Sequence, residues 1–224
     1  MQLYPAALLK ILLPATLIGG AYFAQVYLDL LGSDSRVILD NLPYLFCVVA
    51  VFMANQFNRC RLLLASFGVA TFYWSIQHFL QASLSQPGAL RVYLTISLAL
   101  PVLTFYLLLL PERGIWNLFG LGFFLALILL GLICVPLGPW LTQINEATLS
   151  YYAPYPGRSY VLSFGATLLV VLVALIGTAL LCVRNEEVEA ALIGAFLSLY
   201  LALALIHVKH ISVAMCTAAA LCLV

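Results

Sequence analysis

Three histidines and the polar residues near them are the side chains best suited to bind a ligand. His207 and His210 are three positions apart, and His78 lies in a different apolar stretch. Imidazole nitrogens bind zinc, copper and haem iron, and they also hydrogen-bond to small polar molecules. The full set of candidate ligand-binding residues is Gln25, Asp29, Trp74, His78, Gln81, His207 and His210.

Helical spacing groups these residues by face. Gln25 and Asp29 are four apart, as are Trp74 and His78, so each pair shares one side of a helix. Polar side chains within apolar helices are costly in lipid and normally face a bundle interior. Three interpretations remain open: hydrogen bonds between helices, a polar pocket for a small ligand, or a metal or haem site. The metal site would use His78, His207 and His210.

Motifs for catalysis are missing from the sequence. It has no HExxH, GxSxG, P-loop or glycine-rich dinucleotide turn, and none of its six cysteines forms a CxxC pair. Acidic residues are almost absent from the apolar stretches, which argues against a carboxylate-based ion pump. We therefore expect no catalytic residue and no cofactor in these 224 residues.

The composition indicates a protein that is solvated by lipid. Hydrophobic residues make up 65% of the chain and charged residues only 8%, whereas soluble domains average about 25% charged. So few charges could not cover the surface of a water-soluble domain. The formal net charge of +1 offers no basic surface for nucleic acid, so a lipid bilayer is the expected partner.

Apolar stretches separated by polar or Pro/Gly-rich turns predict the architecture. A membrane-spanning helix needs about 20 apolar residues. We predict an all-α, polytopic transmembrane bundle of 7–8 helices forming a single domain over residues 1–224. The expected spans are about 5–31, 42–57, 62–84, 92–110, 118–137, 159–183, 188–206 and a truncated 211–224, and a kink is expected at Pro101.

The positive-inside rule decides the orientation only weakly. The turn after the second span contains Arg59 and Arg61, whereas the preceding turn has one arginine and two aspartates. We therefore place the N-terminus in the cytoplasm. The candidate polar residues then lie toward the outer leaflet, beneath the aromatic-rich connection 138–158.

Several segments resemble the N-terminal membrane regions of bacterial diguanylate cyclases, the GGDEF proteins. They are Gln56-Phe57-Asn58-Arg59-Cys60-Arg61, Leu110-Pro111-Glu112-Arg113-Gly114 and His207–Val224. The resemblance implies a multi-pass sensory or input module of the bacterial inner membrane. Such a module detects a small ligand and regulates a C-terminal cytoplasmic cyclase domain, through which the protein dimerises. No GGDEF signature is present here, and the apolar end at Val224 suggests a chain cut within its last span.

Two other functions fit parts of the sequence. A small membrane transporter could use Pro101 and glycine-containing spans as broken helices. A haem- or metal-binding membrane oxidoreductase could use His78, His207 and His210.

Overall fold

The computed structural model describes residues 16, 33–80, 87–112, 118–134, 164–184, 186–205 and 209–224. Within these residues the secondary structure is entirely helical, which confirms the all-α prediction. The seven described helices are α2 (Ser33–Gln56), α3 (Cys60–Phe79), α4 (Pro87–Leu109), α5 (Leu118–Cys134), α7 (Phe164–Arg184), α8 (Glu187–Ala204) and α9 (Lys209–Cys222).

Each predicted span from the second onward overlaps one of these helices. The largest difference is in α2, which begins at Ser33 rather than near residue 42 and continues through Pro43. Pro101 also lies inside a helix, α4. The predicted first span, 5–31, and the connection 138–158 lie outside the described residues, except for helical Thr16.

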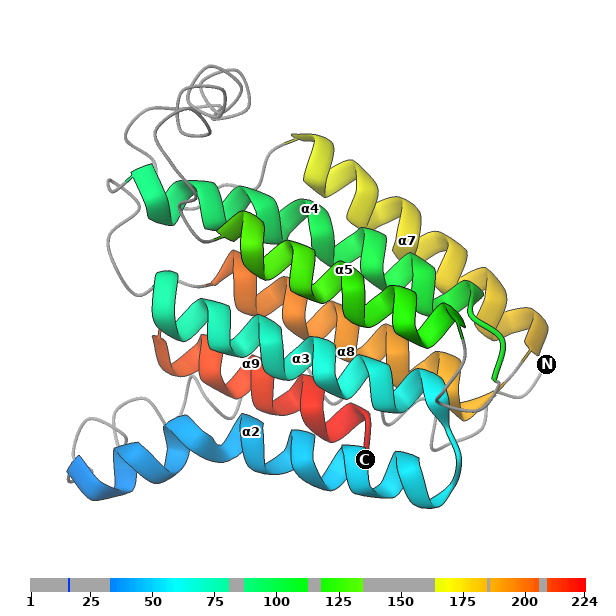
Figure 1. The fold of residues 1–224 in the computed structure, drawn as a ribbon, viewed down its shortest axis with the longest axis horizontal. Helices are drawn as coiled ribbons and strands as arrows, with labels where there is room; N and C mark the ends of the chain where they lie inside the picture. Colours follow the sequence, from blue (N-terminus) through cyan, green and yellow to red (C-terminus); the bar gives the residue numbers. More distant parts are fainter. Residues whose placement is uncertain are drawn as a thin grey trace.

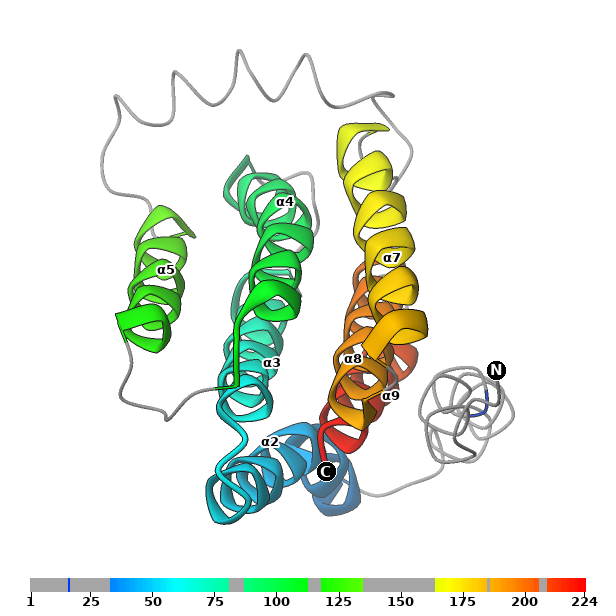
Figure 2. The same cartoon turned by 90° about the vertical axis from the view of Figure 1, so that its right-hand side faces the viewer.

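The helices form a bundle with α8 near its centre. Helix α8 packs against α3, α4, α7 and α9, while α2 lies across α3 and α9 on one side (Figure 1). Helix α5 lies at the left-hand edge of the bundle in Figure 2, and its main neighbours are α3 and α4. The start of α3, the ends of α4 and α7, and the start of α8 all lie at the right-hand end of Figure 1.

Small side chains let the central helices approach closely. Alanines of α8 and α9, such as Ala191, Ala202 and Ala219, are fully buried where these two helices pack. On the opposite side of α8, a Cβ added to Gly177 of α7 would lie 3.0 Å from Ile193 Cγ1. This packing places the two ends of α8 firmly within the bundle.

The outer surface of the bundle is apolar. Val102 of α4, Leu125 of α5 and Leu175 of α7 are each more than half exposed. Two helical segments among the described residues are long and apolar enough to cross a membrane, Ala166–Arg184 and Glu187–Ala204. Only 28% of the first segment is buried, unlike the central helix of a soluble protein, whereas 72% of the second is buried.

Candidate functional site

The turn between α2 and α3 has a defined geometry that fixes the start of α3. The backbone N–H of Arg59 donates to the Ala54 carbonyl over 2.8 Å, and that of Asn58 donates to the Asn55 carbonyl over 3.2 Å. This pair of bonds is a Schellman motif, which requires a left-handed residue after the helix. Asn58 supplies it with φ of 52°, and asparagine tolerates this conformation better than most residues. The turn therefore sets the position of Arg61 in the first turn of α3.

Arg61 is the centre of a buried charge cluster. Its side chain is only 2% exposed, and its guanidinium contacts three carboxylates. Nε donates to Glu112 Oε1 over 2.9 Å and Nη1 to Glu189 Oε1 over 2.9 Å. Nη2 donates to Glu186 Oε2 over 3.3 Å. The planar guanidinium presents its donors in several directions at once, which suits this arrangement.

A second arginine joins the cluster from α7. Arg184 Nη1 lies 3.2 Å from Glu189 Oε1, the oxygen that also accepts from Arg61. Glu189 is 0% exposed and Arg61 only 2%, so this ion pair is shielded from solvent, whereas Arg184 is 39% exposed. It lies in the first turn of α8, where the helix dipole also favours a negative charge. We call Arg61, Glu112, Arg184, Glu186 and Glu189 the charge cluster.

The charge cluster joins segments that are far apart in the chain. It connects the start of α3, the residues after α4, the end of α7 and the start of α8. Its formal charge is −1, from two arginines and three glutamates. In the part of the chain that the structure describes, Glu112 Oε2 and Glu189 Oε2 are buried without a hydrogen-bond partner. The cluster thus holds four helix ends together through ion pairs.

From the sequence, Arg61 was an indicator of orientation and part of the segment Gln56–Arg61, and its burial was not predicted. A signal was present: Glu189 is an acidic residue within an otherwise apolar helix, and such a residue needs a charged partner. The partner could not be identified, because Arg61 and Glu189 are separated by 128 positions.

A second polar network joins α2 to α3. The Tyr73 hydroxyl donates to the backbone carbonyl of Asp40 over 2.6 Å. Gln77 Nε2 donates both to that backbone carbonyl and to the hydroxyl oxygen of Tyr73. The Tyr44 hydroxyl donates to Gln77 Oε1 over 3.5 Å, and its ring lies against that of Tyr73. The Tyr73 hydroxyl thus acts as donor and acceptor at once, so this network orients α2 on α3.

The structure brings together two of the predicted ligand-binding residues. The rings of Trp74 and His78 stack with centroids 4.8 Å apart, as expected for positions i and i+4 of α3. Both side chains are exposed, Trp74 by 41%. Within the described residues they face outward from the bundle.

The other predicted residues cannot be placed beside them. Gln25, Asp29, Gln81 and His207 lie outside the described residues, and for His210 only the helical backbone of α9 is described. The outward-facing pocket therefore stays a prediction. Among the described residues, no three His, Cys, Asp or Glu side chains gather in a way that could hold a metal ion.

No family model, no curated protein and no solved structure matches this chain.

Proposed function

We propose that this chain is a multi-pass helical bundle of the bacterial inner membrane that serves as the input module of a signalling protein. The observation behind this proposal is that its apolar and charged side chains are distributed in the opposite way to those of a water-soluble protein. Leucine, valine and phenylalanine cover the outside of α4, α5 and α7, while Arg61 and Glu189 are buried. In water this arrangement would expose apolar surface and bury charge, both at a cost. In a bilayer the same arrangement is favourable, because lipid solvates the apolar exterior and the charges are paired inside.

The position of the charge cluster supports the proposed topology. It joins three turns that the predicted topology places on one side of the membrane, namely those near Arg61, Glu112 and Arg184. An N-terminus in the cytoplasm would put this end of the bundle at the cytoplasmic surface. At that surface the cluster would lie at the membrane–water interface, where the free-energy cost of burying charged side chains is lower than in the hydrocarbon core.

Helix α8 offers a route from the charge cluster to the end of the chain. Glu189 lies at the start of α8, and α8 packs along α9, the last described helix. A change in how α3 and α7 hold Glu189 would shift α8 and therefore α9. In the diguanylate cyclase family, the last span leads into the cyclase domain, which condenses two GTP into cyclic di-GMP as a dimer. We propose that a small ligand or a membrane property biases this helix movement.

Membrane insertion is tested by expressing the chain in a bacterial host and washing its membranes with alkaline carbonate. The chain is expected to stay in the membrane pellet and to require detergent for extraction. Recovery in the carbonate supernatant would contradict the membrane assignment.

The input role is tested by fusing a GGDEF domain after Val224 and measuring cyclic di-GMP in cells. Arg61→Met breaks the charge cluster, whereas Arg59→Met removes a neighbouring exposed arginine and is the matched control. Couplings between sites typically change affinities about 5–150-fold, so we expect Arg61→Met to change the output at least about fivefold. Equal output from the original chain and both variants, at equal membrane levels, would refute the input role.

A further inference from the structure

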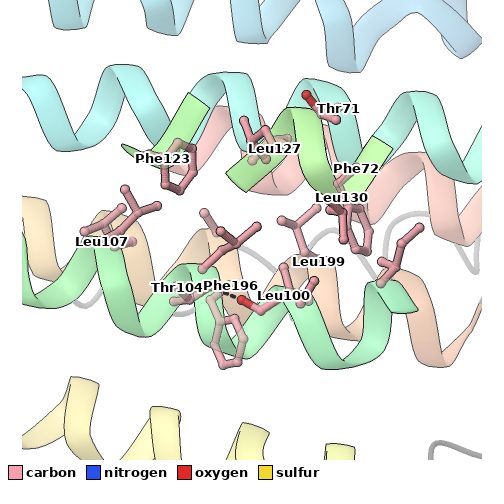
Figure 3. Close-up of a pocket in the computed structure, with 18 of the residues that line it drawn as sticks. Thr71, Phe72, Leu100, Thr104, Leu107, Phe123, Leu127, Leu130, Phe196 and Leu199 are labelled. Atoms are coloured by element: carbon pink, nitrogen blue, oxygen red, sulfur yellow. Dashed lines mark hydrogen bonds between the residues drawn. The ribbon is translucent and has the colours of Figure 1, made fainter. Parts of the chain in front are cut away.

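A partly open cavity lies within the bundle. It is lined by residues of α3, α4, α5 and α8 and has a volume of about 60 Å³. Figure 3 shows side chains from these helices converging on it, among them Phe72, Leu100, Leu127 and Leu199. None of the residues that line it is charged.

The few polar side chains around the cavity are already hydrogen-bonded. The Thr71 hydroxyl donates to the Phe67 carbonyl over 2.8 Å, within its own helix. Ser75 and Thr104 donate in the same way to the carbonyls four residues before them. The walls therefore offer no unused hydroxyl proton to a ligand. An apolar cavity of this kind stays dry, and it takes hydrocarbon rather than water.

Helix α5 is the wall of the cavity that is most weakly supported. Its neighbours are α3 and α4, and its opposite face exposes large apolar residues such as Leu125 and Ile128. Two aromatic contacts hold it: Phe124 packs edge-on against Phe67 of α3, and Phe123 stacks on Tyr106 of α4. In a membrane, this single helix would separate the cavity from surrounding lipid.

We propose that the cavity binds the end of a phospholipid acyl chain, and that its occupancy is the signal that the input module reads. This inference rests on the proposed membrane location. At about 30 Å³ for a water-sized group, the volume suits roughly two methyl or methylene groups. The chain end enters beside α5, displacing its contacts with α3 and α4.

The cavity and the charge cluster share two helices, which links occupancy to the rest of the bundle. Phe72 of α3 and Leu199 of α8 line the cavity, while Arg61 and Glu189 of the same helices form the buried ion pair. A chain end that separates α3 from α8 changes the strain on this ion pair. Occupancy thereby favours one arrangement of the bundle over another, as a signalling ligand must.

The test uses the purified full chain in lipid nanodiscs that contain a phospholipid with a diazirine at the end of one acyl chain. After illumination, mass spectrometry locates the crosslinks. Lipid surrounding the bundle should label exposed residues such as Leu125 in every case. Binding in the cavity is expected to add crosslinks at Leu100 and Leu199, which line the cavity and are buried, so that lipid outside the bundle does not label them.

Two glycines provide a matched pair of variants. Gly68 lines the cavity, and a Cβ there would rest in ordinary contact with Phe123 at 3.6 Å. Gly131 of α5 has open space around its Cβ position. Gly68→Leu should reduce the cavity crosslinks about 15-fold, because two methylene groups lose their burial, whereas Gly131→Leu should leave them unchanged. Ala99→Leu fills the same cavity from α4 and replaces Gly68→Leu if that variant does not fold.

The outcomes separate this inference from the proposed function. Crosslinks confined to exposed residues, in a chain that is inserted in the membrane, would overturn the lipid site and leave the membrane role standing. Cavity crosslinks from a photoreactive free fatty acid, but none from the phospholipid, would also overturn it in favour of a diffusible ligand. A chain that fails to insert would contradict the proposed function itself.

Discussion

Substitution of Arg61 by methionine would test the structural role of the charge cluster most directly. Methionine keeps most of the length of the side chain and removes the guanidinium. Glu189, which is 0% exposed, would retain only Arg184 as a partner, and Glu112 would lose its 2.9 Å contact. The variant thus leaves the buried carboxylates of Glu112 and Glu189 without the positive charge that pairs with both of them.

The size of the effect follows from the burial of each partner. Removing one member of a buried ion pair costs about 3–5 kcal/mol, because the remaining charge cannot reach water. Glu186 offers a comparison within the same cluster, since it is 49% exposed and lies 3.3 Å from Arg61. Partly exposed pairs contribute about 0–1 kcal/mol. Arg61→Met should therefore destabilise the bundle by several kcal/mol more than Glu186→Gln.

The assay is reversible unfolding of the purified chain in mixed micelles with increasing dodecyl sulfate, followed by circular dichroism. The double variant Arg61→Met, Glu189→Met should recover much of the lost free energy of unfolding, since replacing both charges by apolar groups is often neutral or stabilising. Equal effects of Arg61→Met and Glu186→Gln, or a loss below about 1 kcal/mol for both, would refute the buried cluster.

Three further predictions use other parts of the structure. Tyr73→Phe removes the 2.6 Å hydrogen bond to an α2 carbonyl and should lower the free energy of unfolding by about 0.5–1.5 kcal/mol in the same assay. Gly177→Leu places a side chain where α7 and α8 already touch and should destabilise the chain by about 1–3 kcal/mol; Gly131→Leu, with open space around it, should be neutral or stabilising in the same measurement. A reporter enzyme fused after Arg113 should show a cytoplasmic location and one fused near Tyr152 an external location, and the reverse pattern would invert the topology.

The helices were largely predictable from the sequence, because runs of apolar residues indicate them directly. Helix α2 shows where this failed. Ser33 and Asp34 were assigned to the turn before a span that starts near residue 42, yet the helix begins at Ser33 and continues through Pro43. Local propensity is a weak preference that packing can override, and α2 packs along α3 and α9.

The contacts between helices were not predictable in the same way. Helical spacing correctly placed Trp74 and His78 side by side, because they are neighbours within one helix. The charge cluster depends instead on how α3, α7 and α8 pack, and no local pattern states which helices are neighbours. Arg61 is 51 positions from its partner Glu112 and 128 positions from its partner Glu189.

These separations have a consequence for biosynthesis. If the helices enter the membrane in the order of their synthesis, Arg61 is inserted long before its main partner Glu189 has left the ribosome. During that interval Glu112 is the first cluster carboxylate to appear, so it would shield the arginine provisionally. The arrival of α8 would then complete the set of charges and close the bundle. Until α8 arrives, Arg61 would thus lack Glu189, the carboxylate that is most deeply buried with it.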